Sequence, residues 1–308
     1  MAFTAADVKK LREMTSVGMM DCKKALTEAD GDFDKAIELL REKGLAKAAK
    51  KADRIAAEGL VKATVCDECG VGAIIEVNSE TDFVAKNADF QQFVADVANV
   101  VIKDAPADVE ALKACKMGEG TVLDALQEKV LTIGENLQIR RFERFDDSTV
   151  NVAYNHMGGV IGVLVGLEVS EGLKDNATVK ELGKDIGMQA AAMNPSFLDK
   201  SDVSQETLDK EKEIQLAMMA NDPKMAAKPE KVKEGIVMGK LGKYYEENCL
   251  LQQAFVKENK VSVEKHVAAV AKELGGKITV KAFTRFATGE GIEKKEDDFA
   301  AEVASMIH

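Results

Sequence analysis

A seven-residue pattern typical of a β-strand occurs twice in this chain, and it constrains the fold more than any other feature. Each copy has an apolar residue, a basic residue, and then Phe, Arg and Phe at matching positions, in residues 139–145 and 280–286. Two predicted strand hairpins, at residues 60–77 and 151–167, are each followed by a helix with apolar residues at helical spacing. We therefore expect two related subdomains, each an antiparallel sheet covered by helices.

The N-terminal segment has helical rather than strand periodicity. Thr4 and Asp7 have the spacing of a capping box, and a second helix is expected at residues 20–29. Asp32 can cap a third helix, and Gly44 stands where that helix should stop. The segment therefore predicts a small three-helix bundle. Its apolar faces are expected to carry Val8, Leu11, Met14, Cys22, Ala25, Leu26, Phe33, Ala36, Ile37 and Leu40.

Three further segments are predicted to be helical. Residues 41–54 contain six basic and two acidic residues among alanines, which is typical of an exposed linker helix; a contact strip for RNA or an acidic partner is the alternative. Residues 203–245 are rich in Glu, Lys, Met and Ala and are interrupted by Pro223 and Pro229, which predicts a helical hairpin projecting from the sheet like a coiled coil. Residues 297–307 predict a final amphipathic helix.

Together these patterns predict an α+β protein with four parts. The three-helix domain and its linker occupy residues 1–55, and the first core subdomain occupies residues 56–148. The second core subdomain covers residues 149–286 and contains the helical hairpin at about 203–247. A C-terminal helical module is expected at residues 287–308.

Charge and hydropathy narrow the class of protein. The formal net charge of −11 disfavours a general polyanion-binding protein, because phosphate contacts need clustered cations. No apolar run approaches the roughly 18 residues that span a bilayer, and the first residues do not resemble a signal peptide. Five cysteines, without a repeated pattern, favour reduced thiols. We expect a cytoplasmic protein with no membrane partner and no direct nucleic-acid partner.

The sequence lacks the common catalytic motifs. It has no Gly-rich phosphate loop, no Gly-x-Ser-x-Gly elbow and no His-Glu-x-x-His. Its three histidines, His156, His266 and His308, are far apart along the chain. We therefore expect no catalytic residue, no metal and no cofactor.

Cys66 and Cys69 have the spacing of a metal knuckle or a redox pair. A structural zinc site needs a second pair, which the other three cysteines do not supply in motif form. The acidic residues between them, Asp67 and Glu68, should raise the pKa of both thiols. Two incidental cysteines in a hairpin turn are the favoured interpretation; a thiol–metal protein is the alternative.

Residues 78–87 mark the point where a predicted strand gives way to a helix. Thr81 can cap that helix, which places Asp82 and Phe83 in its first turn. A Phe side chain lies more often in a hydrophobic core than on a surface. Phe83, however, follows five polar residues, and an exposed ring at this position would anchor a partner.

Several stretches, in order along almost the whole chain, resemble the bacterial elongation factor Ts family. Members of that family are guanine-nucleotide exchange factors of elongation factor Tu. The matching stretches are Leu11-Arg12-Glu13-Met14-Thr15, Gly18-Met19-Met20-Asp21-Cys22-Lys23-Lys24-Ala25-Leu26, Glu76-Val77-Asn78, Thr81-Asp82-Phe83-Val84-Ala85, Ile133-Gly134-Glu135-Asn136 and Gly289-Glu290-Gly291-Ile292-Glu293.

The resemblance implies a fold and a partner. The fold would be a ubiquitin-associated-like N-terminal domain, a core of two subdomains, a coiled-coil protrusion and a C-terminal module. The partner would be GDP-bound elongation factor Tu, from which GDP and Mg²⁺ are released. The resemblance also implies partner-contacting positions. The pair matching Asp82 and Phe83 intrudes near the magnesium site, and the remaining expected contacts are Thr81, Val84, Ile133, Gly134, His156, Arg12, Met19 and Met20.

Two stretches depart from the family pattern. The turn with Cys66 and Cys69 is not part of it, and residues 221–229 align poorly, so no protrusion contacts are carried over. For Met19 and Met20, packing of one of them in the core is an equal alternative to a partner contact. A ubiquitin-associated-like scaffold that binds a protein or the ribosome, without exchange activity, is the alternative function.

Overall fold

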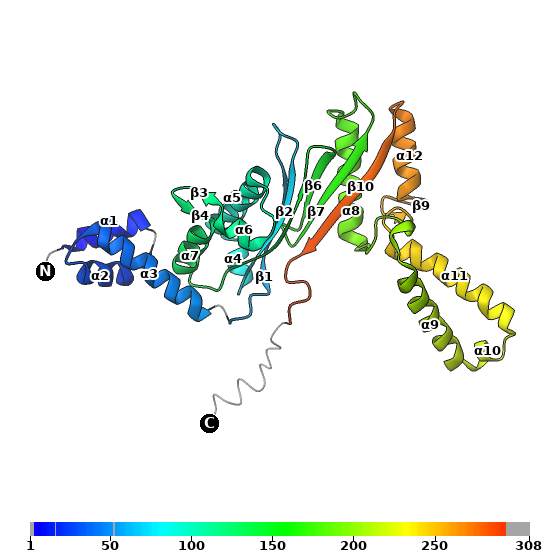
Figure 1. Ribbon diagram of the computed structural model, residues 1–308, viewed down its shortest axis with the longest axis horizontal. Coiled ribbons are helices and arrows are strands. Elements are labelled where there is room, and N and C mark those ends of the chain that lie inside the picture. Colours follow the sequence, from blue (N-terminus) through cyan, green and yellow to red (C-terminus); the bar gives the residue numbers. More distant parts are fainter. Residues whose placement is uncertain (1–2, 16, 52, 294–308) are drawn as a thin grey trace. The chain divides into compact units, whose positions relative to one another are not determined.

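The computed structural model describes residues 3–15, 17–51 and 53–293. The predicted α+β class is confirmed: helices and antiparallel sheets alternate along the chain (Figure 1). None of the helices within the described residues is long and apolar enough to cross a membrane. The helix expected at residues 297–307 lies outside the described residues. The chain divides into two compact units, which are described separately.

The first unit begins with the predicted three-helix bundle. Its core contains Leu11 and Leu26, which are fully buried. The capping box at Thr4 is present, with the Thr4 backbone N–H donating to Asp7 Oδ2 at 2.7 Å. Asp32 likewise caps the third helix through the backbone N–H of Lys35, at 3.1 Å. The helices are α1 (Ala5–Thr15), α2 (Met19–Glu28) and α3 (Phe33–Lys51).

Two predictions for this bundle are wrong. Helix α3 does not stop at Gly44, because the sequence that follows is rich in the helix formers Ala, Lys and Leu. An added Cβ at Gly44 would lie 3.5 Å from Leu131 Cδ2, an ordinary van der Waals contact, so this position faces another helix without excluding a small side chain. Met14, expected in the apolar stripe with Val8 and Leu11, is instead exposed.

The rest of the first unit is built on the sheet of order β1-β2-β5, except that the end of the β1–β2 hairpin, residues 63–74, belongs to the second unit. Both hairpin strands and the first copy of the repeated strand are found where the sequence predicts them. The apolar face of α5 is buried, as expected, including Phe90 and Phe93. Helix α7 was not predicted, although Thr121 and Asp124 form a capping box at its start. The elements are β1 (Glu58–Val65), β2 (Gly72–Ser79), α4 (Asp82–Ala85), α5 (Ala88–Asp104), α6 (Val109–Ala114), β3 (Lys116–Met117), β4 (Gly120–Thr121), α7 (Val122–Ile133) and β5 (Gln138–Phe145).

A buried carboxylate joins three segments of the first unit. The side chain of Glu76 on β2 is 0% exposed, and it accepts hydrogen bonds from Arg140 Nη1 at 3.0 Å and Arg141 Nε at 2.6 Å. The backbone N–H of Gly289 also donates to it, at 2.8 Å. These donors compensate the charge, as a buried carboxylate requires. The hydrogen bond from Gly289 therefore holds the segment near the C-terminal end of the described chain against Glu76 on β2.

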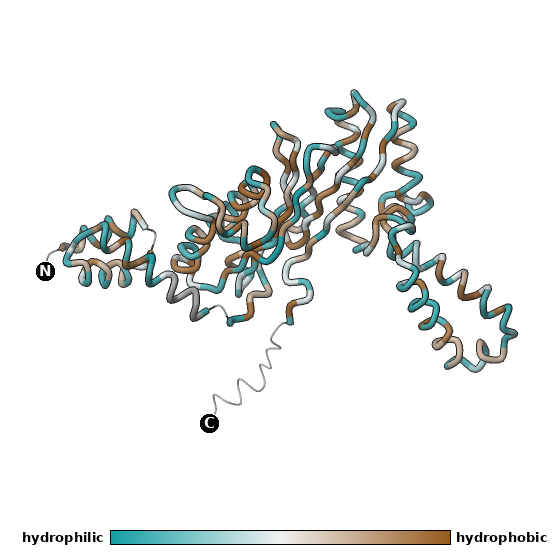
Figure 2. The backbone as a smooth tube through the Cα atoms, in the orientation of Figure 1, coloured by the Kyte–Doolittle hydropathy of each residue, from teal (hydrophilic) through white to brown (hydrophobic). Residues whose placement is uncertain are grey.

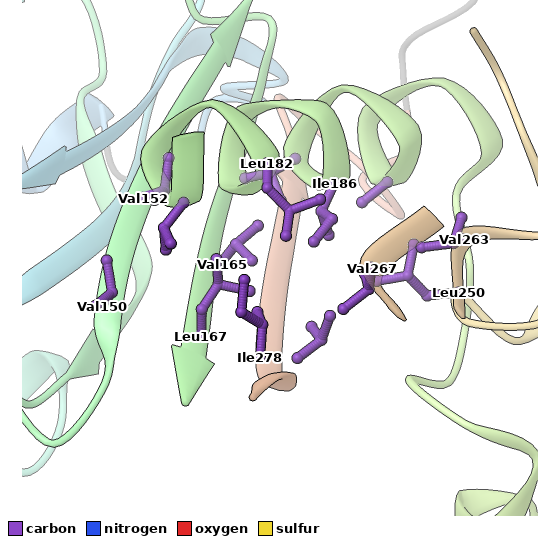
Figure 3. Packing of buried hydrophobic residues seen from close by; sticks show 14 of the residues in the cluster. Val150, Val152, Val165, Leu167, Leu182, Ile186, Leu250, Val263, Val267 and Ile278 are labelled. Carbon is purple, nitrogen blue, oxygen red and sulfur yellow. The ribbon is translucent and has the colours of Figure 1, made fainter. Parts of the chain in front are cut away.

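The second unit contains the second sheet, of order β10-β7-β6. Strands β6 and β7 are antiparallel and in register from Val150 opposite Leu167 to His156 opposite Ile161. Helices α8 and α12 pack against this sheet through aliphatic side chains such as Leu182, Ile186 and Val267 (Figure 3). The elements are β6 (Val150–His156), β7 (Ile161–Val169), α8 (Ala177–Met193), the 3₁₀ turn η1 (Lys200–Asp202), β8 (Ala254–Phe255), β9 (Glu258–Ser262), α12 (Val263–Glu273) and β10 (Ile278–Ala287).

The two sheets have the same internal order, which confirms the repeat. In each one the second strand of a hairpin, β2 or β7, lies between the first hairpin strand and the repeated strand, β5 or β10. The division of the chain at residues 55, 148 and 286 stays a prediction.

Two glycines let α8 approach β6 closely. A Cβ at Gly183 would lie 2.4 Å from Val152 Cγ2, and one at Gly187 would lie 2.6 Å from Tyr154 Cβ. Real Cβ atoms do not tolerate such distances, so a larger residue would force the helix and strand apart.

The predicted helical hairpin follows α8 in the second unit. Figure 1 shows α9 and α11 side by side, joined through α10. Met219 and Val237 are buried, and Lys240 Nζ donates to Gln215 Oε1 at 2.7 Å. Hydrophobic positions are interspersed with hydrophilic ones along both long helices (Figure 2). The helices are α9 (Gln205–Asn221), α10 (Pro223–Ala226) and α11 (Glu230–Asn248).

Candidate functional site: an exposed aromatic corner

The turn from β2 into α4 forms a polar corner in the first unit. Thr81 occupies the N-cap position of α4 with an extended backbone. Its side chain makes no capping hydrogen bond, so the prediction that it caps the helix is wrong. The hydroxyl donates instead to Glu135 Oε1 at 2.6 Å, since a charged acceptor makes the stronger hydrogen bond.

Two glutamates hold this corner against the end of α7. Glu135 Oε2 accepts the backbone N–H groups of Glu80 and Thr81, each at 3.0 Å. Glu80 Oε1 in return accepts the backbone N–H of Asn136 at 2.6 Å. The Asn136 side-chain amide donates to the carbonyl of Arg54 at 2.7 Å. This reciprocal exchange of hydrogen bonds fixes two segments that are far apart in sequence.

Phe83 projects from this fixed corner into solvent. It is 79% exposed, whereas its neighbour Val84 is buried and anchors α4. The alternative that Phe83 fills the core is therefore wrong. Burying a Phe ring stabilises a protein or a complex by about 1.5–3 kcal/mol. Because Phe83 stays exposed in the folded chain, a partner that covered the ring would gain this free energy.

Lys86 lies over both residues of the expected exchange pair. Its Nζ donates to Asp82 Oδ2 at 2.6 Å and lies 6.0 Å from the centroid of the Phe83 ring. The hydrogen bond from Lys86 lowers the pKa of Asp82. The carboxylate is exposed and ionised at neutral pH, so it presents a negative charge beside the ring.

A groove of about 420 Å³ runs between α4 and the last turns of α7. Phe83 and Ile133 are among its lining residues. Gly134 ends α7 in a left-handed conformation, with φ of 88°, and this turns the chain toward Glu135. The structure therefore brings together the expected contacts of residues 81–84 and 133–134. The remaining lining residues are Val84, Asn87, Asp89, Glu128, Lys129 and Thr132.

His156 belongs to the second unit, at the end of β6. Its Nδ1 lies 3.1 Å from the hydroxyl of Tyr154, and the two rings are stacked. The turn that follows exposes Met157, in a left-handed conformation, and Val160. This turn presents an apolar surface beside the histidine.

The three expected N-terminal contacts lie on the surface of the bundle. Arg12 is exposed on α1, and Met19 and Met20 are exposed at the start of α2. The alternative that one of these methionines packs in the core is therefore wrong. Exposed Met14 adds a further flexible apolar side chain to the bundle.

Cys66 and Cys69 lie in the turn between β1 and β2, which belongs to the second unit. The hydrogen bonds from the Cys69 thiol and backbone N–H lower the pKa of Cys66, and they outweigh the opposing charge of Glu68. The prediction of two raised pKa values is thus wrong for Cys66 and confirmed in direction for Cys69. Across the part of the chain that the structure describes, no three His, Cys, Asp or Glu residues are grouped so as to hold a metal ion.

Sequence comparisons agree with this architecture. A family model described as Elongation factor TS matches residues 80–290, which include the aromatic corner and most of the second unit. Elongation factor Ts of Syntrophotalea carbinolica is 50% identical over 99% of both chains. Those of Clostridium kluyveri and Clostridium perfringens are also 50% identical, over 98–99% of each chain. These matches place the chain among the translation elongation factors. The chain belongs to the elongation factor Ts family.

Some site residues were missed by the sequence reasoning. Glu80 and Glu135 position the corner, and Lys86 pairs with Asp82, but none of them was among the expected contacts. The signal for Glu135 was its place in the stretch 133–136 that resembles the family. Lys86 lies four residues after Asp82, the spacing of an ion pair on a helix. The other groove residues on α7, Glu128, Lys129 and Thr132, were not expected, because that helix was not predicted.

Proposed function

We propose that the chain is a guanine-nucleotide exchange factor for elongation factor Tu. The exposed ring of Phe83, on a corner fixed by Glu135, is the observation that carries the proposal. Membership of the elongation factor Ts family supports it. The protein would bind the GDP-bound GTPase and promote release of GDP and Mg²⁺. It makes and breaks no covalent bond, so it is not an enzyme of bond chemistry, and its place of action would be the cytoplasm.

Exchange requires that the factor bind more tightly to a deformed nucleotide site than to an intact one. The coupling is reciprocal: bound GDP must lower the affinity of the GTPase for the factor by the same ratio as the factor lowers its affinity for GDP. An acceleration of about 10⁴-fold corresponds to about 5.5 kcal/mol of differential interaction. One Phe ring supplies about 1.5–3 kcal/mol. Phe83 therefore cannot act alone.

We propose a divided interface for that reason. Met19, Met20 and Arg12 on the bundle, and the turn at His156, would hold the partner. Phe83 would wedge between elements of the partner, and Asp82 would compete for groups that organise its magnesium ion. The pairing with Lys86 lowers the pKa of Asp82 further below its ordinary value, so the free protein presents an ionised carboxylate at neutral pH.

The direct test is the rate of release of fluorescent GDP from purified elongation factor Tu in stopped flow. Phe83→Ala is expected to slow exchange by more than tenfold, while the unfolding transition stays where it is because the ring is exposed. Leu123→Ala is the matched control, since Leu123 is also an exposed apolar residue of the first unit, on α7. An unchanged rate for Phe83→Ala would end the wedge proposal.

Met20→Ser tests separately whether the N-terminal bundle binds the partner. Met20 is 63% exposed, so the change should leave the fold intact. The factor concentration that gives half-maximal exchange should rise severalfold, whereas the maximal rate should change little. If Met20→Ser changed the half-maximal concentration and the maximal rate equally, the proposal that the bundle binds the partner while Phe83 deforms its nucleotide site would be contradicted.

A further inference from the structure

We propose that Cys66 and Cys69 form a redox-active dithiol that reacts with low-molecular-weight disulfides and closes into a reversible intramolecular disulfide. The pair lies outside the residues proposed to contact the partner, so this proposal does not rest on the exchange function.

The backbone of the turn places the two cysteines on the same side. The N–H of Gly70 donates to the carbonyl of Cys66 at 2.9 Å, and the N–H of Cys66 donates to the carbonyl of Val71 at 2.9 Å. The first of these bonds closes one helix-like turn, in which residues three apart have Cβ atoms about 5–6 Å from each other. A disulfide needs a Cβ separation of about 3.5–4.5 Å, which a small adjustment of a surface turn can supply.

The backbone of Cys69 already contacts the sulfur of Cys66: its N–H donates to Cys66 Sγ at 3.3 Å. The neighbouring Cys69 thiol and this N–H stabilise a thiolate on Cys66, which lowers its pKa, while the same pairing raises the pKa of Cys69. Cys66 is therefore the nucleophile, and Cys69 holds the proton until it is needed.

The other three cysteines differ from this pair. Cys22 and Cys249 are buried, and burial raises the pKa of Cys249 to about 11. Burial also raises the pKa of Cys115, whose thiol donates to the carbonyl of Ala111 at 3.3 Å. Thiolates are the reacting form, so Cys115 and Cys249 are expected to react slowly. Cys22 is fully buried and out of reach of a dissolved disulfide.

The reaction is a thiol–disulfide exchange in two steps. The Cys66 thiolate attacks one sulfur of the small disulfide, the S–S bond breaks, and one small thiolate leaves and takes up a proton. The Cys69 thiol then loses its proton and attacks Cys66 Sγ. A protein disulfide forms, and the second small thiol leaves. The dithiol is oxidised, and the small disulfide is reduced to two thiols.

The test uses the full chain and oxidised glutathione as the probe, followed by alkylation of free thiols and mass spectrometry. The proposal expects free thiols to fall from five to three, with Cys66 and Cys69 joined and no glutathione retained. Cys69→Ser is expected to accumulate a mixed disulfide on Cys66. In the wild type, a limiting amount of iodoacetamide is expected to alkylate Cys66 before Cys69. Cys115→Ser is the control and should behave as the wild type.

Three results would overturn the proposal. The first is a wild-type protein that keeps five free thiols, and the second is one that retains glutathione on either cysteine of the turn. The third is a wild-type protein in which limiting iodoacetamide alkylates both cysteines of the turn equally fast, because the assignment of the nucleophile would then be wrong. GDP release plays no part in the readout, so failure here would leave the exchange proposal standing.

Discussion

Thr81 donates its hydroxyl hydrogen bond to Glu135 at 2.6 Å, although the two residues are 54 positions apart in sequence. This contact joins the corner that carries Phe83 to the loop that ends α7. The charged carboxylate accepts three hydrogen bonds from the corner, two of them from backbone N–H groups. Such bonds are about twice as strong as neutral ones, so the exposed ring projects from a stiff base.

Replacing Glu135 should loosen that base without removing the ring. Glu135→Gln removes the charge and turns one acceptor oxygen into a donor, so the Thr81 hydroxyl must accept instead of donate and all three hydrogen bonds become neutral ones. We expect exchange to slow by up to about tenfold, since hydrogen bonds to a charged acceptor are about twice as strong as neutral ones. Amide hydrogen exchange at Glu80 and Thr81 should speed up in the same variant.

A surface glutamate gives the matched control for this change. Glu110 makes an exposed ion pair with Lys113 at 2.7 Å. Glu110→Gln should therefore change neither GDP release nor amide exchange at Glu80 and Thr81. If Glu135→Gln also left amide exchange at the corner unchanged, the positioning role of Glu135 would be excluded.

The start of α7 should respond to acid. The Thr121 backbone and side chain hydrogen-bond to Asp124 and lower its pKa below the ordinary value of 3.8. Because the folded-state pKa is the lower one, the stabilisation is present above the ordinary pKa and is lost as the pH falls through the folded value. Asp124→Asn should cost at most about 1 kcal/mol near neutral pH.

The pH dependence of that difference is the measurement. Denaturation of wild type and Asp124→Asn should give a gap in unfolding free energy that narrows between about pH 5 and pH 3. The capping box at Asp7 is common to both proteins, so its titration cancels. A gap that stayed constant with pH would mean that the charge of Asp124 contributes nothing to the cap.

Glycines in two helices of the second unit should respond in opposite directions. Gly183→Ala places a methyl group 2.4 Å from Val152 Cγ2, so it should destabilise the protein by about 1–3 kcal/mol. Gly239 on α11 has nothing within 4 Å of an added Cβ. Gly239→Ala should stabilise by up to about 1 kcal/mol, because alanine favours the helix. Thermal denaturation of both variants measures the contrast, and equal shifts would contradict the close packing of α8 on β6.

The buried cluster around Glu76 should be sensitive to loss of charge. Glu76→Gln leaves the guanidinium groups of Arg140 and Arg141 without their shared carboxylate, and breaking such a cluster costs about 3–5 kcal/mol. The control is Glu168→Gln, which removes an exposed pair with Lys281 at 3.7 Å and should cost less than about 1 kcal/mol. Similar shifts of the urea midpoint in the two variants would show that the cluster adds no stability.

Much of the secondary structure could be predicted because it depends on local patterns. The caps at Thr4 and Asp32 were found from spacing, and so were the repeated strands β5 and β10. Helix α7 was missed despite its capping box at Thr121. Helix α3 continued through Gly44 because helix-forming residues follow the glycine.

The site was predicted residue by residue, but not as an assembly. Asp82 and Ile133 were expected as contacts from resemblance alone, whereas the polar residues before Phe83 also indicated an exposed ring that could anchor a partner. The exposure of Phe83 and the exposure of both Met19 and Met20 were open questions in the sequence, and the structure answered them. Thr81 was expected to cap α4, and the nearby carboxylate of Glu135 gave its hydroxyl a stronger acceptor.

The amino-acid sequence by itself determined the α+β class, the order of most elements and the family, because periodicity, capping residues and family motifs are all local properties. Only the tertiary structure decided where those elements meet. A hydrogen bond such as that from Thr81 to Glu135 depends on how the chain folds back, and so does the groove that Phe83 shares with Ile133. Residue spacing does not encode such contacts, since packing across many residues sets them.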